Sequence, residues 1–390
     1  MGQQALITVR KVVRPDGTLW PLVLSNGFPS PLPNLWLLDF EDSLARNTLE
    51  AYARDVAWLY ESLHREHINI DYRLSQMRGF RKAELTTIAN YLTITKNGKP
   101  AAHSTTVRRF ESVRLFIEYC FDHFTEMQNL SLLEQVQAEK NKNRLLKTLT
   151  KKIKFRLSEC SSFTPSTALT TSQQTLISLK LSVDHPSNPF SKKELKLRNL
   201  CIYEVALATL ARRSEIVLLE LTDLTLDTNP TILIKKPTPN NKNKRHDGAS
   251  LKTRGRKVPI TNELASLLIQ YVSTAREVLL QDGTPSLALF LSNRDGRRLS
   301  SNSLNKILSA VEVSIQSPDN RVRVHPHGLR ATAANNIRRK MTDNGLDGEE
   351  LTEVMSYLGG WVQGSQMVQK YSRDALAERL AKILRDEHGE

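Results

Sequence analysis

Apolar residues recur at steps of three and four positions through most of this chain, which is the spacing of helices that bury one face. The clearest run is TLEAYARDVAWLYESL, whose apolar stripe has five members: Leu49, Tyr52, Val56, Leu59 and Leu63. A second helix is expected around residues 82–92. A third runs through TTVRRFESVRLFIEYCFDHF, with its predicted buried face at Val107, Phe110, Val113, Phe116, Ile117 and Cys120. This part of the chain is therefore predicted to be a compact helical bundle.

Helical patterns also fill most of the second half of the chain. One helix opens on Ser191 and Glu194, which have the spacing of a capping box, and others follow in NELASLLIQYVSTAREVLL, SNSLNKILSAVEVSI, GLRATAANNIRRKM and DALAERLAKILRD. Two short β-branched segments, TILIKK and KVPIT, flank a basic loop and predict a small sheet. The predicted fold class is mainly α with a small antiparallel β-sheet in the C-terminal domain.

A chain of 390 residues exceeds what one hydrophobic core usually serves, so two domains are expected. Residues 1–40 contain a Pro-Asp-Gly turn between two apolar runs and predict an N-terminal arm or hairpin. Residues 41–157 hold the helical bundle. The Ser- and Thr-rich stretch at 158–172 is interpreted as a linker, and residues 173–390 form the second domain.

The positive charge of the chain indicates an anionic partner. The formal net charge is +14 and the sequence pI is about 9.7, which favours nucleic acid. Two blocks hold much of this charge: residues 140–156 have no acidic residue, and residues 235–257 have only Asp247. Such blocks suit phosphate contacts with release of counterions, although a solvated surface segment has the same composition.

The sequence suggests neither a membrane nor an oxidising compartment. No segment approaches the eighteen or so apolar residues of a membrane-spanning helix, and the first residues lack the apolar region of a secretory signal. The three cysteines, Cys120, Cys160 and Cys201, have neither metal-ligand spacing nor a disulfide pattern. We expect a reducing cytoplasm, and no metal or other cofactor.

Four features that could carry chemistry follow one another in the predicted second domain. The first is TLARRSEIVLLEL, where Arg212 and Arg213 lie at a break between helical patterns. The second is LKTRGRKVPIT, where Lys252 precedes a short strand. Taken singly these are ordinary residues, since an arginine at a helix end usually meets carbonyls or solvent, and a loop lysine is usually solvated.

The third feature is HPHGLRATAANN, where His327 and Arg330 are three positions apart and so face the same way on a helix. Such a pair can bind a phosphate oxygen and move a proton, although a capping histidine and a surface arginine have the same pattern. The fourth is LGGWVQGSQMVQKYSR, where Gly359 and Gly360 end a helix and a short run leads to Tyr371. A single tyrosine there is usually a packing residue.

In this order, the four features resemble the tyrosine recombinase (phage integrase) family. The segment RRSE is similar to the family's first arginine box, with Arg212 at the catalytic arginine and Glu215 at its accompanying acid. His327 and Arg330 are similar to the His-x-x-Arg box, and Tyr371 stands at the nucleophile. The resemblance covers the whole second domain, and the helical first domain looks like the family's core-binding module.

The chain departs from the family's pattern at three places. Trp361 is assigned to the position where most members carry histidine and some carry tryptophan, although Gly360 is also close and the spacing to the tyrosine is one residue longer than usual. Leu210 stands where the family often has glycine. The catalytic lysine has two candidates, Lys252 and Lys236, and Lys252 is favoured because it lies in a Lys-Thr pair ahead of the Pro-Ile strand.

The resemblance implies a reaction that cuts and rejoins DNA strands without metal, cofactor or ATP. Arg212 and Arg330 would hold the scissile phosphate, because permanently charged guanidinium groups stabilise its oxygens as they gain charge. Tyr371 would attack and form a 3′-phosphotyrosyl intermediate, with His327 as proton acceptor or positioning group. Lys252 would protonate the departing 5′-hydroxyl.

The resemblance also gives the remaining parts a function. Trp361 would donate its indole N–H to a phosphate oxygen or pack on the nucleophile's segment. The two domains would close around double-stranded DNA as a clamp, in a homo-tetramer on two recombination sites, with room for accessory proteins. The last helix, with Leu376, Leu380, Ile383 and Leu384 on one face, would bury itself in its own domain or, as the family suggests, dock into a neighbouring protomer. A cytoplasmic, nucleoid-associated recombinase or integrase of a mobile element is expected.

Two other functions fit parts of the same pattern. A type IB topoisomerase uses the same chemistry as a monomer, but the separate helical N-terminal domain and the C-terminal helix favour a recombinase. A non-catalytic DNA-binding relic of an integrase is the alternative from a different class. The complete set of motif residues favours an active enzyme over a relic. The relic remains an alternative because Gly360 lies close to the position where most family members have histidine.

Overall fold

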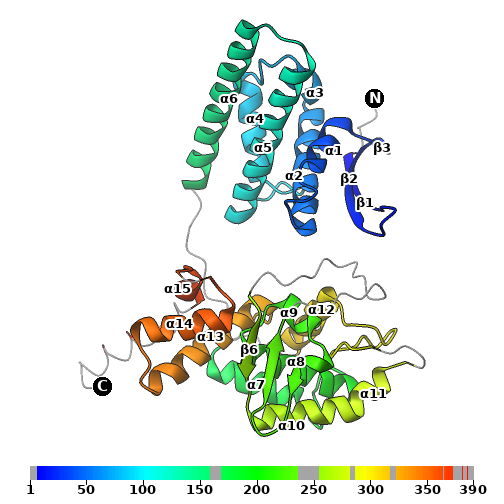
Figure 1. Cartoon of the computed structure of the whole chain (residues 1–390), viewed down its shortest axis with the longest axis vertical. Helices are drawn as coiled ribbons and strands as arrows, with labels where there is room; N and C mark the ends of the chain where they lie inside the picture. Colours follow the sequence, from blue (N-terminus) through cyan, green and yellow to red (C-terminus); the bar gives the residue numbers. More distant parts are fainter. Residues whose placement is uncertain are drawn as a thin grey trace. The chain divides into compact units, whose positions relative to one another are not determined.

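The computed structural model consists of two compact units (Figure 1). It describes residues 7–158, 168–235, 254–281, 286–316, 322–362 and 364–371, together with residues 380 and 384. The first unit is Met1–Thr164 and the second is Pro165–Glu390, and each has its own cluster of buried apolar side chains. Most of the predicted last helix and the whole basic loop around Lys252 lie outside the described residues.

The first unit is a helical bundle with a small antiparallel sheet beside it. Its elements are β1 (Ile7–Val13), β2 (Leu19–Ser25), β3 (Phe28–Pro29), α1 (Pro31–Leu38), α2 (Arg46–Arg65), α3 (Ile70–Ser75), α4 (Lys82–Thr93), α5 (His103–Met127) and α6 (Leu132–Ser158). The PDGT turn joins β1 to β2, in which Val9 pairs with Val23. This hairpin packs on α2 (Figure 1), so the N-terminal segment shares the core of the bundle.

The core of the first unit lies between α2 and its neighbours. The predicted stripe of α2 is inside it, with four members buried: Leu49, Val56, Leu59 and Leu63. Trp36 from α1 stacks on Tyr52 with ring centroids 5.5 Å apart and meets Phe116 of α5 edge-on at 5.4 Å. Val107 departs from the predicted buried face of α5, because it is 36% exposed.

The second unit contains most of the shorter elements. They are α7 (Thr171–Leu181), α8 (Lys193–Thr209), α9 (Arg213–Leu218), η1 (Leu221–Asp223), β4 (Leu224–Thr225), β5 (Thr231–Ile234), β6 (Arg256–Pro259), α10 (Asn262–Gln270), η3 (Tyr271–Ala275), α11 (Arg276–Leu279), α12 (Ser301–Ile315), α13 (Pro326–Asp343), α14 (Gly348–Gly359) and α15 (Met367–Tyr371). Helix α8 is central, with contacts to α7, α10 and α13.

The antiparallel sheet predicted in the C-terminal domain is present, with strand order β4-β5-β6. Ile232 pairs with Val258, and both side chains are buried in the core of the second unit. Strand β6 forms one edge of this sheet among the described strands. The predicted fold class, mainly α with a small antiparallel sheet, is confirmed.

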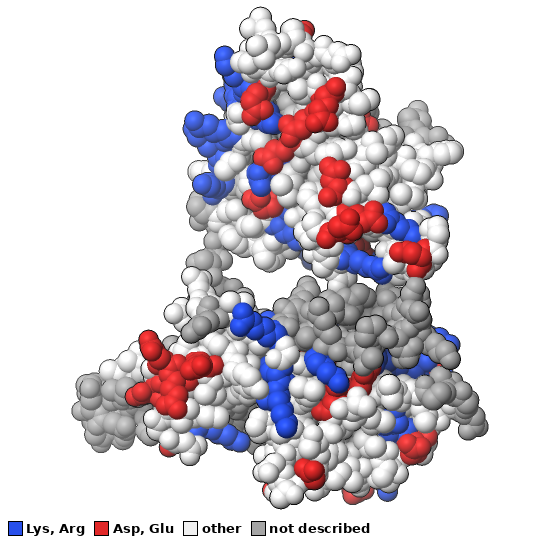
Figure 2. All heavy atoms as spheres, in the orientation of Figure 1, with Lys and Arg blue, Asp and Glu red and all other residues white. Residues whose placement is uncertain are grey.

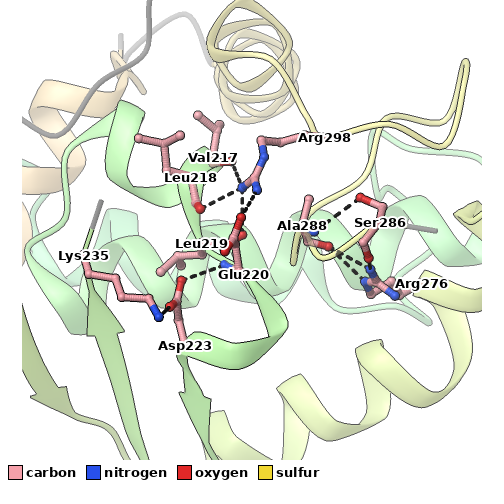
Figure 3. Close-up of polar contacts among 10 residues, drawn as sticks. All are labelled: Val217, Leu218, Leu219, Glu220, Asp223, Lys235, Arg276, Ser286, Ala288 and Arg298. Carbon is pink, nitrogen blue, oxygen red and sulfur yellow. Dashed lines mark hydrogen bonds and ion pairs between the residues drawn. The ribbon is translucent and has the colours of Figure 1, made fainter. Parts of the chain in front are cut away.

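Polar contacts hold the short helix α9 in place (Figure 3). The Arg298 guanidinium donates to the carbonyl oxygen of Leu218 at 2.7 Å and to the carboxylate of Glu220 at 2.5 Å. Lys235, at the end of β5, pairs with Asp223 at 3.2 Å. A helix of six residues is too short to be stable alone, so capping of its C-terminal carbonyls by an arginine stabilises it.

Charged side chains are unevenly distributed over the surface (Figure 2). Lys and Arg gather over α6, whose sequence carries the basic run predicted to contact phosphates. Acidic side chains gather over α14, where Glu349 and Glu350 occupy the first turn. In the part of the chain that the structure describes, no helix has the length and apolar character needed to cross a membrane.

Gly79 and Gly98 provide a matched test of packing in the first unit. Both have a φ of +73°, so an added Cβ strains the backbone similarly. At Gly79 the Cβ would also lie 2.2 Å from the Leu145 side chain of α6, whereas nothing lies within 4 Å of it at Gly98. We expect Gly98→Ala to lower the free energy of unfolding by about 1 kcal/mol and Gly79→Ala by about 2 kcal/mol, because the terminal methyl of Leu145 must also move.

Urea unfolding followed by tryptophan fluorescence measures both changes, because Trp20, Trp36 and Trp58 all lie in the first unit. The difference between the two variants isolates the cost of displacing Leu145. Equal losses would contradict tight packing of α6 at this position.

Candidate active site

The buried carboxylate of Glu215 gathers three arginines. Its Oε2 accepts the main-chain N–H of Arg212 at 2.9 Å and the guanidinium of Arg256 at 2.8 Å. The guanidinium of Arg330 lies 3.9 Å from the same oxygen. Glu215 is the third residue of α9 and Arg212 directly precedes that helix, so the local sequence forms half of a capping box. The carboxylate thereby offsets the mutual repulsion of three neighbouring cations.

Arg330 is held from several directions. Its side chain donates to the carbonyl oxygens of Gly359, at 2.8 Å, and Leu210. Burial, together with repulsion from Arg212, lowers the pKa of Arg330 to about 10, so the group remains charged at neutral pH. Its Nε has no hydrogen-bond partner among the described residues. The guanidinium is therefore fixed in position.

Leu210 forms the turn between α8 and α9. Its φ of +53° lies in the left-handed region, which glycine adopts without strain and leucine does not. The side chain is fully buried, and burial of a leucine contributes about 2 kcal/mol, more than the roughly 1 kcal/mol cost of the backbone strain. The turn aims the Leu210 carbonyl at Arg330. This chain therefore adopts, at a leucine, a backbone conformation that favours glycine.

His327 contacts the hydroxyl of Tyr371. Its Nδ1 lies 3.0 Å from the Tyr371 Oη, and the two rings have centroids 5.2 Å apart. The histidine that caps α13 is a different one, since Nδ1 of His325 accepts the main-chain N–H of Gly328 at 3.2 Å. The two histidines of the HPH segment therefore have different contacts: His325 caps α13, and His327 contacts the hydroxyl of Tyr371.

The phenol of Tyr371 is in a buried and cationic environment. The residue is 6% exposed. Burial raises the pKa of its hydroxyl above the ordinary value, while the nearby charges of Arg330 and Arg212 act in the opposite direction. The phenol is therefore protonated at neutral pH, and the arginines stabilise any negative charge that develops on its oxygen.

Trp361 supports the ring of Tyr371. The two rings stack with centroids 5.4 Å apart and planes within 9° of parallel. Gly360 ends α14 with a φ of +61°, and a Cβ on Gly359 would lie 2.5 Å from the Trp361 ring. The Gly-Gly pair is thus required, one residue for the left-handed turn and the other for the close approach of the indole. The indole N–H has no hydrogen-bond partner among the described residues.

A cleft of about 690 Å³ opens on these groups. Its lining includes four of the predicted catalytic residues: Arg212, His327, Arg330 and Tyr371. Arg213 and Arg323 add positive charge to the lining, and Glu312 adds one acidic group. Trp361 lies behind Tyr371, against its ring. The structure therefore brings together residues from three of the four motifs in a cationic cleft that suits an anionic ligand.

Lys252 and Lys236 both lie outside the described residues, so the choice between them stays a prediction. Arg256 was missed by the sequence analysis, although it alternates with buried Val258 on β6 and is itself 3% exposed. The sequence signal that could have identified Arg256 is its position in the strand, two residues before the apolar residue that faces the core and so on the same face. Within the described part of the chain, no three His, Cys, Asp or Glu side chains are grouped to hold a metal ion.

A family comparison identifies the class of protein that this fold and site define. The phage integrase family model matches residues 183–378, about half of the chain. The chain therefore belongs to the phage integrase family and is an enzyme of the tyrosine-type site-specific recombinases. No curated protein sequence matches it.

Similar solved structures include recombinases of distant sequence. A lambda integrase dimer bound to a core site has a TM-score of 0.50 and 13% identity, over 87% of this chain and 93% of that one. XerA recombinase has a TM-score of 0.39 and 18% identity, over 90% and 98%. XerH recombinase bound to a palindromic difH substrate has a TM-score of 0.45 and 14% identity, over 91% and 93%. At this identity, the likeness to lambda integrase concerns the fold.

Replacing Glu215 with glutamine tests whether its charge holds the arginines together. The amide has almost the same shape but leaves Arg256 and Arg330 without a counter-charge in a buried site. We expect the free energy of unfolding to fall by about 3 kcal/mol. Calorimetric unfolding of the full chain measures this loss as a lower transition temperature.

The control is Asp295→Asn, which weakens a surface ion pair with Arg294, a side chain that is 89% exposed. Such pairs contribute little, so this variant should unfold at the wild-type temperature. If Glu215→Gln also unfolds there, the arginines do not depend on the carboxylate.

Proposed function

We propose that this enzyme cuts and rejoins DNA strands at specific sites through a covalent bond between Tyr371 and the 3′ phosphate of the cut strand. The observation that carries the proposal is the position of the Tyr371 hydroxyl. It lies 3.0 Å from Nδ1 of His327, with the Arg330 guanidinium 5.6 Å from the centre of its ring, in a cationic cleft. Nucleophile, proton acceptor and phosphate-binding charge are therefore present in one place.

Arg212 and Arg330 supply the charge that the scissile phosphate needs. During attack the non-bridging oxygens gain negative charge, and guanidinium groups that are already in place stabilise it without reorganisation. Glu215 contacts both arginines and limits their movement. We propose that these groups replace the metal ion that many phosphoryl-transfer enzymes use.

The proton of the attacking hydroxyl passes to His327. As the bond from the Tyr371 oxygen to phosphorus forms, the bond from phosphorus to the 5′ oxygen breaks. The 5′ oxygen leaves with a proton that we assign to Lys252, with Lys236 as the other candidate. Rejoining runs in reverse, and because the ester keeps the energy of the broken bond, no ATP is needed.

Trp361 holds the nucleophile's ring in this scheme. Its stack on Tyr371 fixes the plane from which the hydroxyl projects. The indole N–H is buried and has no hydrogen-bond partner among the described residues, so a contact with a phosphate oxygen would require the site to open.

Double-stranded DNA is the proposed substrate and partner. The lambda integrase of similar fold is a dimer bound to a core site. In this chain the basic run on α6 offers phosphate contacts that hold the duplex without reading its sequence. We propose that both units contact one duplex. Four copies would assemble on two recombination sites through the segment after Tyr371. In the cell, the reaction would take place at the nucleoid, would serve a mobile element and would involve accessory proteins.

A trapped adduct tests the covalent step. The site is first selected from random duplexes by immobilised Tyr371→Phe protein, which binds DNA without cutting it. On a nicked duplex with the selected site, we expect the wild-type enzyme to form an adduct that survives denaturing electrophoresis. Tyr371→Phe should form none, and EDTA should not reduce the yield, because arginines provide the charge.

An adduct in Tyr371→Phe would move the nucleophile elsewhere, and loss of the adduct in EDTA would contradict the metal-free scheme. Rapid relaxation of a plasmid without the selected site by monomeric protein would indicate a type IB topoisomerase. Failure to select any site would count against site-specific recombination.

The pH dependence of His327→Ala tests the proton transfer. The pKa of Tyr371 is raised, so without His327 the phenolate is scarce at pH 7 and increases about ten-fold for each pH unit up to pH 9. We expect single-turnover cleavage by the variant to be about 100-fold slower at pH 7 and to recover as the pH rises. Wild-type cleavage should depend less on pH.

His185→Ala is the control, because His185 belongs to the second unit but does not line the cleft. Its profile should match the wild type. A variant His327→Ala that is slow at every pH by the same factor would show that His327 positions the tyrosine without taking its proton.

A further inference from the structure

The hydroxyl of Tyr357 binds both main-chain groups of one residue. It accepts the N–H of Lys257 at 3.1 Å and donates to the carbonyl oxygen of Lys257 at 3.0 Å. The two residues are 100 positions apart in the chain. Tyr357 comes from α14 and is 51% exposed, so its ring contributes little to the core while its hydroxyl makes a long-range connection.

This contact closes an open edge of the sheet. Strand β6 lies at the edge of β4-β5-β6 among the described strands, so main-chain groups on its outer side lack a neighbouring strand. Tyr357 satisfies one such pair of groups at Lys257. A single side chain thus attaches α14 to β6 at a defined register.

The other side of β6 reaches the arginine cluster. Arg256, adjacent to Lys257, points into the core and pairs with Glu215 at 2.8 Å. Glu215 in turn contacts Arg212 and lies 3.9 Å from Arg330. A shift of β6 is therefore transmitted through one buried ion pair to the groups that face the cleft.

Helix α14 contacts the same cluster a second time. Two residues after Tyr357, the carbonyl oxygen of Gly359 accepts a hydrogen bond from Arg330 at 2.8 Å. The contacts form a closed circuit from Arg330 through Gly359 and Tyr357 to β6, and back through Arg256 and Glu215. In such a circuit the position of each guanidinium depends on the connection at Tyr357.

We infer that Tyr357 is a positioning residue for cleavage, which holds β6 so that Arg256 and Glu215 keep the phosphate-binding arginines in place. This inference rests on the proposed function. Because the hydroxyl is at the surface, water can take over both of its bonds in Tyr357→Phe, and the variant folds. What it loses is the fixed register between α14 and β6.

Two substrates separate positioning of the arginines from a general structural effect. One is the nicked duplex with the selected site and an ordinary scissile phosphate. In the other a methyl group replaces one non-bridging oxygen of that phosphate, which makes it neutral and reduces its need for guanidinium charge. We expect Tyr357→Phe to slow single-turnover cleavage of the ordinary phosphate about ten-fold and that of the neutral one less than about two-fold.

Matched variants calibrate the result. Tyr271→Phe removes a hydroxyl that donates to the Leu289 carbonyl at 3.1 Å, elsewhere in the second unit, and should cleave both substrates at wild-type rates. Arg330→Ala should lose far more activity on the ordinary phosphate than on the neutral one. These variants show that the pair of substrates reports on the arginines.

Equal slowing of Tyr357→Phe on both substrates, or no slowing, would overturn the inference. A third substrate carries sulfur in place of the 5′-bridging oxygen, and this sulfur leaves without a proton. If that substrate restores the cleavage rate of Tyr357→Phe and the neutral phosphate does not, the inference is also overturned, because the Tyr357 hydroxyl would then act on the leaving group. If the wild-type enzyme forms no adduct with any of these duplexes, the proposed function itself fails, whatever Tyr357→Phe does.

Discussion

A single buried carboxylate makes the cationic site of this protein possible. Three guanidinium groups near one another repel, and in a buried setting that repulsion would exclude at least one of them. Glu215 offsets it with one negative charge and takes its partners from three parts of the chain: the turn before α9, strand β6 and helix α13. The packing of these elements is therefore organised around an electrostatic requirement as well as an apolar core.

The backbone around the site serves the same requirement. Arg330 is oriented by the carbonyls of Leu210 and Gly359. A left-handed backbone conformation places each carbonyl: that of Leu210 itself in one case, and that of the next residue, Gly360, in the other. Helix α9, which carries Glu215, is capped at its far end by Arg298. Specific contacts at the ends of helices and in turns therefore set the geometry of the cleft.

The sequence predicted the fold class and the family correctly, because both depend on local signals. Helical stripes such as that of α2 and the paired segments around β5 and β6 are periodic, and the motif order carried the resemblance to the family. The contacts that connect the motifs were not predictable. Arg256 meets its carboxylate 41 positions away, and Tyr357 meets Lys257 100 positions away. No rule of sequence spacing relates residues that are so far apart in the chain. Arg256 was therefore counted only among the basic residues of the block at 235–257.

The acidic first turn of α14 has a consequence for how the second unit meets a polyanion. Glu349 and Glu350 lie at one end of the helix, and Gly359, beside the arginines, lies at the other, about 15 Å away along the axis. The two ends of one helix therefore have opposite local potentials in a chain of net charge +14. If a duplex binds as proposed, these potentials would attract it to one end of the helix and repel it from the other, and so would orient its approach.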